Sequence, residues 1–343
     1  MTAFVFSEPN FDAHEQVVFA CEPKSGLKAI IAVHNTNLGP AMGGCRMWNY
    51  RDEAQAVNDV LRLSRGMTYK NAVAGLPIGG GKSVIIGNPK TDKTPALFEA
   101  LGEALERLGG RYVTAEDVGT HHHDMAHVAS KTSYVAGLGA SGDPSPYTAL
   151  GCFVGAQAAV KHHLGRDSME GLVVALQGLG NVGYDYARRL KQAGARLIVA
   201  DIDQAALERA QAELGAQVVA VEAIYDVEAD IYAPCALGAT LNLGTLDRLK
   251  ARIVAGAANN QLATAEIGEL LRQKGVLYAP DFVINAGGII KVCYEYLDKP
   301  ENEVEAHVRR IGETLAEVFV RADREQLPTS TVADRLAEAR FKR

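Results

Sequence analysis

A lysine and an aspartate stand out as residues that could carry acid–base chemistry. Lys82 lies between the glycines at 79–81 and the apolar run 84–86, which has the length and β-branched content of a buried strand. These glycines are predicted to form a loop, because glycine lacks a Cβ atom and lets a ligand approach the backbone closely. Burial favours the neutral form of a lysine amine, which suits Lys82 to proton transfer. Asp117 follows a predicted strand over 112–115, a common place for the chemistry of an α/β domain.

A phosphate-binding loop is the first alternative for the segment around Lys82, because Gly-Lys-Ser is part of that motif. The motif also needs a glycine at position 76 and a helix after the lysine. Position 76 is leucine, the nearest earlier glycine is Gly75, and the residues that follow have the composition of a strand. The match is therefore partial, and nucleotide hydrolysis is not favoured.

A second motif predicts a dinucleotide site. The apolar run 172–177 leads directly into Gly178-x-Gly180-x-x-Gly183, and a predicted helix follows to about residue 193. These glycines permit a tight turn and let a pyrophosphate reach the helix N-terminus, where free N–H groups favour anions. Because strand, glycine motif and helix occur in the required order, the signal is specific.

The acidic residues after the next predicted strand indicate which dinucleotide binds. The strand 195–200 ends at Asp201, with Asp203 close behind, where the adenosine ribose is expected. A carboxylate there can bind the ribose 2′-hydroxyl and would repel a 2′-phosphate. The next arginine along the chain is Arg209. NAD is therefore favoured over NADP.

Composition limits the class of protein. A chain of 343 residues is long enough for two domains, and its 48% hydrophobic and 22% charged residues are typical of globular proteins. The net charge of −6 disfavours a nucleic-acid partner, and no apolar stretch is long enough to span a membrane. The N-terminus shows no secretory signal. Five scattered cysteines without paired spacing indicate reduced thiols and a cytoplasmic protein.

Hydrophobic periodicity predicts an α/β fold in two domains that flank a cleft. An N-terminal α/β domain with a mixed sheet is expected over 1–140 plus about 325–343, and a Rossmann domain over 141–324, with a linker at 137–146. The glycine-rich segment 38–46 is predicted to be a loop. The other predicted strands cover 17–23, 27–35, 217–221, 230–236, 252–258 and 275–280, and the predicted helices cover 52–69, 94–108, 147–163, a long segment from 301 and a short one after 330.

Several motifs together resemble the glutamate/leucine/phenylalanine/valine dehydrogenases. The glycine-rich lysine signature of that family matches Leu76-x-x-Gly-Gly-Gly-Lys82-x-Val84-x-x-x-Asn88-Pro89. The resemblance covers nearly the whole chain in order. Within the family, the chain most resembles the leucine and phenylalanine dehydrogenase branch. Its other motifs are Gly-Pro-Ala-Met-Gly-Gly-Cys-Arg (39–46), Met-Thr-Tyr-Lys (67–70), Glu-Asp-Val-Gly-Thr (116–120), the glycines 178–183, Gly-Ala-Ala-Asn-Asn-Gln (256–261) and Asn-Ala-Gly-Gly (285–288).

The resemblance implies reversible, NAD-dependent oxidative deamination of an L-amino acid to a 2-oxo acid and ammonia. By motif position, Lys70 would bind the substrate carboxylate and Lys82 would activate the water that attacks the imine carbon. Asp117 would transfer protons to and from the nitrogen. A lysine and a carboxylate form the acid–base pair that imine formation and hydrolysis require, and a fixed substrate carboxylate orients the Cα–H bond.

The resemblance also implies the substrate class. Glutamate-specific relatives hold the side-chain carboxylate with a lysine and a serine, and the matching positions here are Met42 and Val292. An isolated carboxylate buried against apolar groups is costly, so a hydrophobic amino acid is expected. Leucine, valine, phenylalanine and tryptophan are not ranked. The predicted substrate site comprises Lys70, Met42, Gly43, Gly44, Met67, Ala115, Ile289 and Val292.

The cofactor site and the assembly are likewise implied by the resemblance. A homo-oligomer assembled through the first domain is expected, with a small-molecule amino acid or 2-oxo acid and ammonia as its ligands. The predicted cofactor-binding residues are Gly178, Gly180, Asn181, Val182, Gly183, Asp201, Thr148, Cys235, Ala236, Asn259, Asn260 and Asn285. Asn259 and Asn260 could alternatively cap a turn.

Other roles are less favoured. His123 and His127 have the spacing of neighbours on one helix face, but the tract 121–127 lacks the glutamate of a metalloprotease motif and a clear third ligand, so no metal site is predicted. Cys45 and Cys235 are expected to be structural and not nucleophiles. The alternative function is a non-catalytic NAD-binding sensor on the same fold, which would not need the Lys82 and Asp117 pair.

Overall fold

A computed structural model describes residues 5–139 and 143–342. The chain divides into two compact units: unit 1 comprises 1–142, 292–299 and 337–343, and unit 2 comprises 143–291 and 300–336. The predicted linker spans this division, and its residues 140–142 lie outside the described part. The units differ from the predicted domains at 292–299, which belong to unit 1, and at 325–336, which belong to unit 2.

Unit 1 is built on a mixed sheet of five strands in the order β1-β2-β4-β3-β5. The strands β1 and β2 form an antiparallel hairpin, and β2 pairs antiparallel with β4. The remaining pairs, β4 with β3 and β3 with β5, are parallel. The strands are β1 (Gln16–Glu22), β2 (Leu27–Asn35), β3 (Ala41–Trp48), β4 (Gly79–Ile86) and β5 (Tyr112–Glu116).

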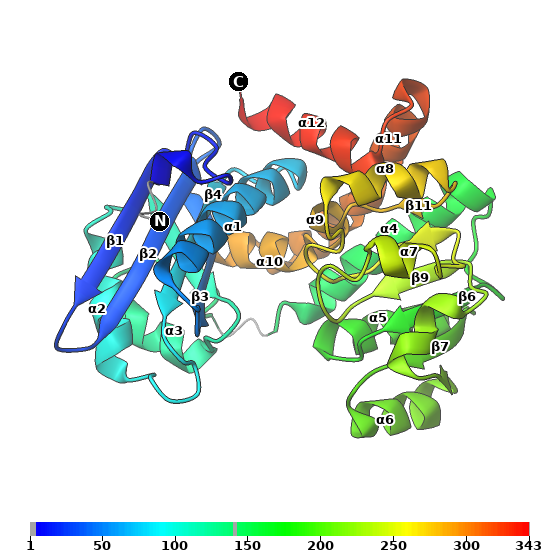
Figure 1. Cartoon of the computed structure of the whole chain (residues 1–343), viewed down its shortest axis with the longest axis horizontal. Helices are drawn as coiled ribbons and strands as arrows, with labels where there is room; N and C mark the ends of the chain where they lie inside the picture. The colour runs from blue at the N-terminus through cyan, green and yellow to red at the C-terminus, as the bar shows by residue number, and fades with distance from the viewer. Residues whose placement is uncertain (1–4, 140–142, 343) are drawn as a thin grey trace. The chain divides into compact units, whose positions relative to one another are not determined.

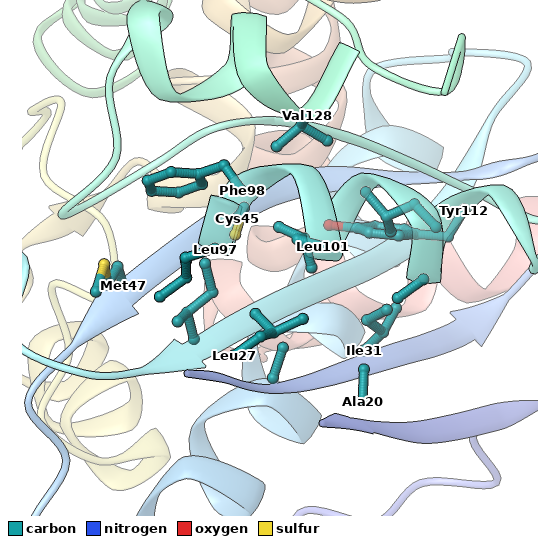
Figure 2. Close-up of a cluster of buried hydrophobic side chains, with 14 of the residues drawn as sticks. Ala20, Leu27, Ile31, Cys45, Met47, Leu97, Phe98, Leu101, Tyr112 and Val128 are labelled. Atoms are coloured by element: carbon teal, nitrogen blue, oxygen red, sulfur yellow. The ribbon is translucent and has the colours of Figure 1, made fainter. Parts of the chain in front are cut away.

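Each face of this sheet is covered by its own helices, as the period of two in β2 requires. Ala29 and Ile31 face the core formed with α2 (Pro95–Glu106) and α3 (His122–Ala129). Figure 2 shows this core, in which Leu97, Phe98 and Leu101 of α2 approach Tyr112 and Val128. The alternate residues Ile30 and Ala32 face α1 (Glu53–Val73) on the other side. Unit 1 also contains the short helix η1 (Val5–Ser7).

The prediction that the glycine-rich segments are loops was wrong. Residues 41–46 lie within β3 and the glycines 79–81 within β4. A Cβ on Gly43 would lie 1.9 Å from the carbonyl oxygen of Gly81, and one on Gly80 would lie 2.0 Å from the amide nitrogen of Thr68 in α1. The close approach that these glycines permit is therefore an approach of the chain to itself. Glycines contribute no side chain to the alternation that marks a strand, so the glycine-rich parts of β3 and β4 could not be predicted as strands from hydrophobic periodicity.

Helix α1 is longer than predicted. The side chain of Asp52 caps its first turn by accepting a hydrogen bond from the backbone N–H of Gln55. The helix continues to Val73, four residues beyond its predicted end, so Lys70 lies within its last turns together with residues 67–69. This places Met67, Lys70 and the residues between them on a rigid element that packs against β4.

Unit 2 contains a parallel sheet of six strands in the order β11-β10-β9-β6-β7-β8, with a switch point between β6 and β9. This is the strand order of a Rossmann fold, as the sequence predicted. Open α/β sheets bind ligands at the carboxyl ends of the strands beside the switch point. The strands are β6 (Val173–Gln177), β7 (Arg196–Ala200), β8 (Gln217–Val218), β9 (Ile231–Pro234), β10 (Ile253–Val254) and β11 (Leu277–Tyr278).

Helices cover the unit 2 sheet and complete it. One face packs against η2, α7 and α8 through Tyr225, Leu246 and Ile267. Helices α4 and α5 contact strands of the same sheet, and α11 packs along α4. The helices are α4 (Ser145–Leu164), α5 (Asn181–Gln192), α6 (Gln204–Leu214), η2 (Val221–Asp226), α7 (Leu243–Leu246), α8 (Ala265–Gln273), α9 (Asp281–Ile284), η3 (Glu301–Glu303) and α11 (Val304–Glu325), and α10 (Gly287–Tyr296) and α12 (Thr329–Phe341) have residues in both units (Figure 1).

Candidate active site

The two predicted acid–base residues lie side by side in unit 1. The ammonium nitrogen of Lys82, in β4, is 3.0 Å from Oδ2 of Asp117, which follows β5 directly. The Lys82 side chain is 6% exposed and that of Asp117 is 24% exposed. Strands β4 and β5 both pair with β3, so the sheet itself brings these residues together. A nearly buried amine beside a partly accessible carboxylate is an arrangement that can exchange protons with a bound ligand.

A second cation shares the same carboxylate oxygen. The Nε atom of Arg46, in β3, donates a hydrogen bond of 3.1 Å to Oδ2 of Asp117. Burial opposes the charge of Asp117, but Lys82 and Arg46 outweigh it, so the pKa of Asp117 lies below its ordinary value. Asp117 is therefore ionised at neutral pH when no ligand is bound.

The position of Asp117 depends on a glycine in the adjacent strand. A Cβ on Gly44 would lie 2.6 Å from the carbonyl oxygen of Glu116 and 2.7 Å from Cβ of Asp117. Gly44 is paired with Ala115 in the parallel ladder between β3 and β5. A side chain at position 44 would thus push the end of β5 away from β3, and Asp117 with it.

The predicted substrate residues of unit 1 lie on β3, β5 and α1, which belong to the same sheet or cover it. Gly43 faces Met67, because a Cβ on Gly43 would be 3.0 Å from Cγ of Met67. Lys70 and Met67 are partly exposed near the end of α1. Ala115 lies in β5, which is separated from the strand of Lys82 by β3. Met42 is fully buried in β3. The roles of these residues as substrate contacts remain predictions.

The glycine motif of unit 2 forms a tight turn between β6 and α5. Gly178 has a φ of +103°, which strongly favours glycine, and a Cβ there would also meet Ala236 at 2.7 Å. A Cβ on Gly183 would be 2.0 Å from the carbonyl oxygen of Gly178. Gly180, in contrast, has no atom within 4 Å of an added Cβ, so its position is open to a ligand. Gly180 and the adjacent Asn181 are exposed at the N-terminus of α5, and Val182 follows in its first turn.

Asp201 holds this turn in place. Its Oδ2 accepts a hydrogen bond of 2.5 Å from the backbone N–H of Leu179, and its Oδ1 accepts one of 2.8 Å from the N–H of Asp203. Asp203 itself caps α6 by accepting hydrogen bonds from Ala205 and Ala206. The sequence had placed both acids near the ribose, but the structure gives Asp203 a capping role. Asp201, at the end of β7 beside the glycine turn, fits the position of a ribose ligand.

Unit 2 also contains a buried amide, that of Asn285, whose nitrogen is hydrogen-bonded and whose oxygen is not, within the described residues. Asn285 donates hydrogen bonds through its Nδ2 to Oδ1 of Asn259 at 2.9 Å and to the carbonyl oxygen of Ala257 at 3.0 Å. Within the described residues, its buried Oδ1 has no hydrogen-bond partner. Buried acceptors normally find a donor, so this oxygen is available to one from a ligand. The open position at Gly180, Asp201 and this acceptor together fit a dinucleotide.

The other predicted cofactor residues surround the ends of these strands. Cys235 and Ala236 follow β9, and Asn260, with a φ of +52°, contacts the loop after them through its carbonyl oxygen, which accepts from the N–H of Ala239 at 2.7 Å. Thr148 lies in α4 against Gly288, whose added Cβ would be 2.7 Å from the Thr148 hydroxyl. Ile289 and Val292, which were predicted to contact the substrate and not the cofactor, both lie in α10 and are partly exposed.

Neither the histidine tract nor the cysteines add a site. His123 and His127 lie in α3 with their Nε2 atoms 3.3 Å apart, and no group of three or more metal-ligating side chains occurs among the described residues. Burial raises the pKa of the Cys45 and Cys235 thiols to about 12 each. Thiols of this kind are poor nucleophiles at neutral pH.

Sequence reasoning missed Arg46 as a partner of Asp117 and Asp59 as a second partner of Arg46. Arg46 ends the quoted motif 39–46, yet nothing in the spacing indicated which carboxylate it would meet. Its Nη1 atom lies 3.0 Å from Asp59, a residue of α1 that no motif contains. The available signal was the place of Arg46 at the end of the glycine motif 39–46.

The two units define an α/β protein with a Rossmann sheet and a separate acid–base pair. A family model described as Glu/Leu/Phe/Val dehydrogenase, dimerisation domain, matches residues 14–134. A second, described as Glutamate/Leucine/Phenylalanine/Valine dehydrogenase, matches residues 199–339. The chain therefore belongs to the Glu/Leu/Phe/Val family of amino acid dehydrogenases.

Individual relatives agree with this assignment. The chain is 51% identical to the leucine dehydrogenase of Thermoactinomyces intermedius, over 96% of this chain and 91% of that one. It is 46% identical to the phenylalanine dehydrogenase of Bacillus thermotolerans, over 96% and 88%. Among solved structures, L-tryptophan dehydrogenase from Nostoc punctiforme superposes with a TM-score of 0.86 at 44% identity, covering 96% of each chain. Within the described residues, no helix is long and apolar enough to cross a membrane.

Proposed function

We propose that this protein catalyses the reversible, NAD-dependent oxidative deamination of a hydrophobic L-amino acid. In the forward direction, the amino acid, NAD⁺ and water give the 2-oxo acid, an ammonium ion, NADH and a proton. The observation that supports this proposal most directly is the contact of 3.0 Å between Lys82 and Asp117 in a member of an amino acid dehydrogenase family. NAD, when bound, supplies the hydride acceptor for the substrate Cα.

The residues of unit 1 divide the remaining work between them. Lys70 binds the substrate carboxylate and so fixes the orientation of the Cα–H bond. In its neutral form, the amine of Lys82 takes a proton from the water that attacks the imine carbon. Asp117 accepts a proton from the substrate nitrogen and returns one to the leaving ammonia. Because both groups of the acid–base pair lie on one rigid sheet, their separation is set before substrate arrives.

Apolar residues support a hydrophobic substrate. Met42 and Val292 stand where glutamate-specific relatives are expected to carry charged or polar side chains. Neither Met42 nor Val292 carries a charge that could balance a side-chain carboxylate of the substrate, and burying that carboxylate without a partner would be costly. Relatives named leucine, phenylalanine and tryptophan dehydrogenase agree with this class.

A substrate panel tests the proposal. We expect NADH formation at alkaline pH, which favours the proton-releasing direction, with one or more of L-leucine, L-valine, L-phenylalanine and L-tryptophan. L-glutamate should be turned over at least about 100-fold less efficiently in kcat/KM, because its carboxylate would be buried without a partner. NADH absorbance gives the rates. NAD binding without turnover of any amino acid would instead support the non-catalytic sensor.

The cofactor preference can be changed at one residue. We expect Asp201→Asn to weaken NADH binding about tenfold and to strengthen NADPH binding, since the negative charge that repels a 2′-phosphate is removed. The asparagine oxygen can still accept from Leu179. Dissociation constants for NADH and NADPH, measured by titration, give the ratio. The control is Glu208→Gln, which removes one negative charge from an exposed position in α6 and should leave the ratio unchanged. If Asp201→Asn also leaves the ratio of the two dissociation constants unchanged, the proposed ribose contact is contradicted.

The assembly, location and domain roles belong to the same proposal. We infer that unit 1 carries substrate binding and oligomerisation and that unit 2 binds NAD. The match of residues 14–134 to a family model described as a dimerisation domain supports a homo-oligomer. The five scattered cysteines, which lack paired spacing in the sequence, support a cytoplasmic location, where thiols stay reduced.

A further inference from the structure

A chain of charged groups extends from Asp117 away from Lys82. Arg46 donates through Nε to Oδ2 of Asp117 at 3.1 Å and through Nη1 to Oδ2 of Asp59 at 3.0 Å. Asp59 also accepts a hydrogen bond of 2.8 Å from the hydroxyl of Tyr50 and one of 2.9 Å from Nη2 of Arg62. One guanidinium thus bridges two carboxylates, and the outer carboxylate is itself held by two further donors.

This arrangement uses the two oxygens of Asp117 differently. Both Lys82 and Arg46 contact Oδ2. Among the described residues, no group donates a hydrogen bond to Oδ1, although 24% of the Asp117 side chain is exposed. A carboxylate fixed through one oxygen by two cations from different strands cannot rotate freely. Its other oxygen therefore keeps one direction and stays open to a ligand.

From this geometry we propose that Asp59 is a positioning residue for the deamination reaction. It fixes the guanidinium of Arg46, and Arg46 fixes Oδ2 of Asp117, so that Oδ1 remains directed at the substrate nitrogen. Asp59 touches neither substrate nor cofactor in this scheme. The inference rests on the proposed function, because the orientation of Asp117 matters only if Asp117 transfers the proton.

The network is accessible enough to alter without unfolding the protein. Arg46, Tyr50, Asp59 and Arg62 line an open cavity of about 420 Å³, and the side chains of Arg46 and Asp59 are 21% and 15% exposed. Water in such a cavity can solvate the partners left by a substitution. Changes at position 59 should therefore affect catalysis more than stability.

The pH dependence of kcat gives a readout that a merely structural role would not move. Removing the charge at position 59 loosens Arg46, which helps to keep Asp117 ionised, so the acid limb of the profile should move to higher pH. The other titratable groups near Asp117 are the same in the wild type and in the variants at position 59. Burial raises the pKa values of Cys45 and Tyr112, Asp124 pairs with Lys93, and Glu116 and His121 are exposed. Lys82 is common to all variants.

The experiment compares Asp59→Asn with Asp59→Glu and Glu53→Gln. Glu53 is exposed in the first turn of the same helix, and its substitution removes the same charge. We expect Asp59→Asn to lower kcat about 10- to 100-fold, with KM for the amino acid changed less than about threefold, as for misplacement of a catalytic group. Asp59→Glu should recover part of kcat, and Glu53→Gln should match wild type.

Two further measurements separate the possible failures. Arg46→Lys keeps the charge but replaces the two fixed donors, Nε and Nη1, by one flexible ammonium nitrogen, so it should lose at least as much kcat as Asp59→Asn. Tyr50→Phe removes one donor to Asp59 without changing charge and tests the idea if Asp59→Asn does not fold. Wild-type kcat and pH profile in Asp59→Asn and Tyr50→Phe would overturn the inference. Absence of turnover in the wild-type protein would overturn the proposed function instead.

Discussion

Replacement of Lys82 by alanine should lower kcat for amino acid deamination by roughly 10³-fold, since general acid–base catalysis contributes about 10²- to 10⁴-fold. The variant leaves the attacking water without a proton acceptor and Asp117 without one of its two cations. Arg46 remains 3.1 Å from Asp117, so the carboxylate is still paired and the variant should fold. NADH formation under saturating substrate measures the loss.

A lysine nearby in sequence provides the control. Lys90 is exposed in the turn after β4, and Lys90→Ala should retain wild-type kcat. Thermal unfolding of Lys82→Ala should resemble that of the wild type, because Arg46 still pairs with Asp117. NADH titration should also resemble the wild type, because the Rossmann unit does not contain this residue. If Lys82→Ala keeps more than about a tenth of wild-type kcat, Lys82 is not the proton acceptor of the chemical step.

Two glycines of the same turn should respond differently to alanine. In Gly183→Ala, the new Cβ would lie 2.0 Å from the carbonyl oxygen of Gly178, a backbone atom that cannot move without opening the turn. We expect unit 2 to lose about 3 kcal/mol or more of its free energy of unfolding, and NADH binding to disappear. Denaturant unfolding and a fluorescence titration with NADH measure the two effects.

Gly180→Ala is the matched variant. Its φ of −64° suits any residue, and no atom lies within 4 Å of the added Cβ. The free energy of unfolding should therefore change by less than about 0.5 kcal/mol. NADH binding should nevertheless weaken at least about tenfold, because the second glycine of the motif lets the backbone approach the pyrophosphate. Unchanged NADH affinity in Gly180→Ala would place the pyrophosphate elsewhere.

Elements with side-chain patterns could be predicted from the sequence. The strands β1, β2 and β6 and the helices α2 and α4 lie within a few residues of their predicted limits, because each carries a clear hydrophobic period or a capping residue. Thr94, for instance, accepts a hydrogen bond from Leu97 at the start of α2. The Rossmann order followed from strands that alternate with helices behind a glycine motif.

Glycine-rich segments could not be assigned in the same way. The segments 38–46 and 79–81 were expected to be loops open to a ligand, but residues 41–46 and 79–81 lie in the strands β3 and β4 of the unit 1 sheet. Gly43 and Gly80 are required there because β3, β4 and α1 approach one another too closely for a Cβ. That requirement comes from neighbours far apart in the chain, and composition alone does not distinguish it from contact with a ligand.

The sequence by itself determined the residue types of the chemistry. The motifs placed Lys82 and Asp117 at the ends of predicted strands and a glycine turn before Asp201, because these motifs are local and carry their own context. Only the tertiary structure decided which charges meet. Arg46 is 13 residues from Asp59 and 71 from Asp117, and no local pattern links the three. Their contact follows from the sheet order, in which β3 lies between β4 and β5, and from the packing of α1 against that sheet.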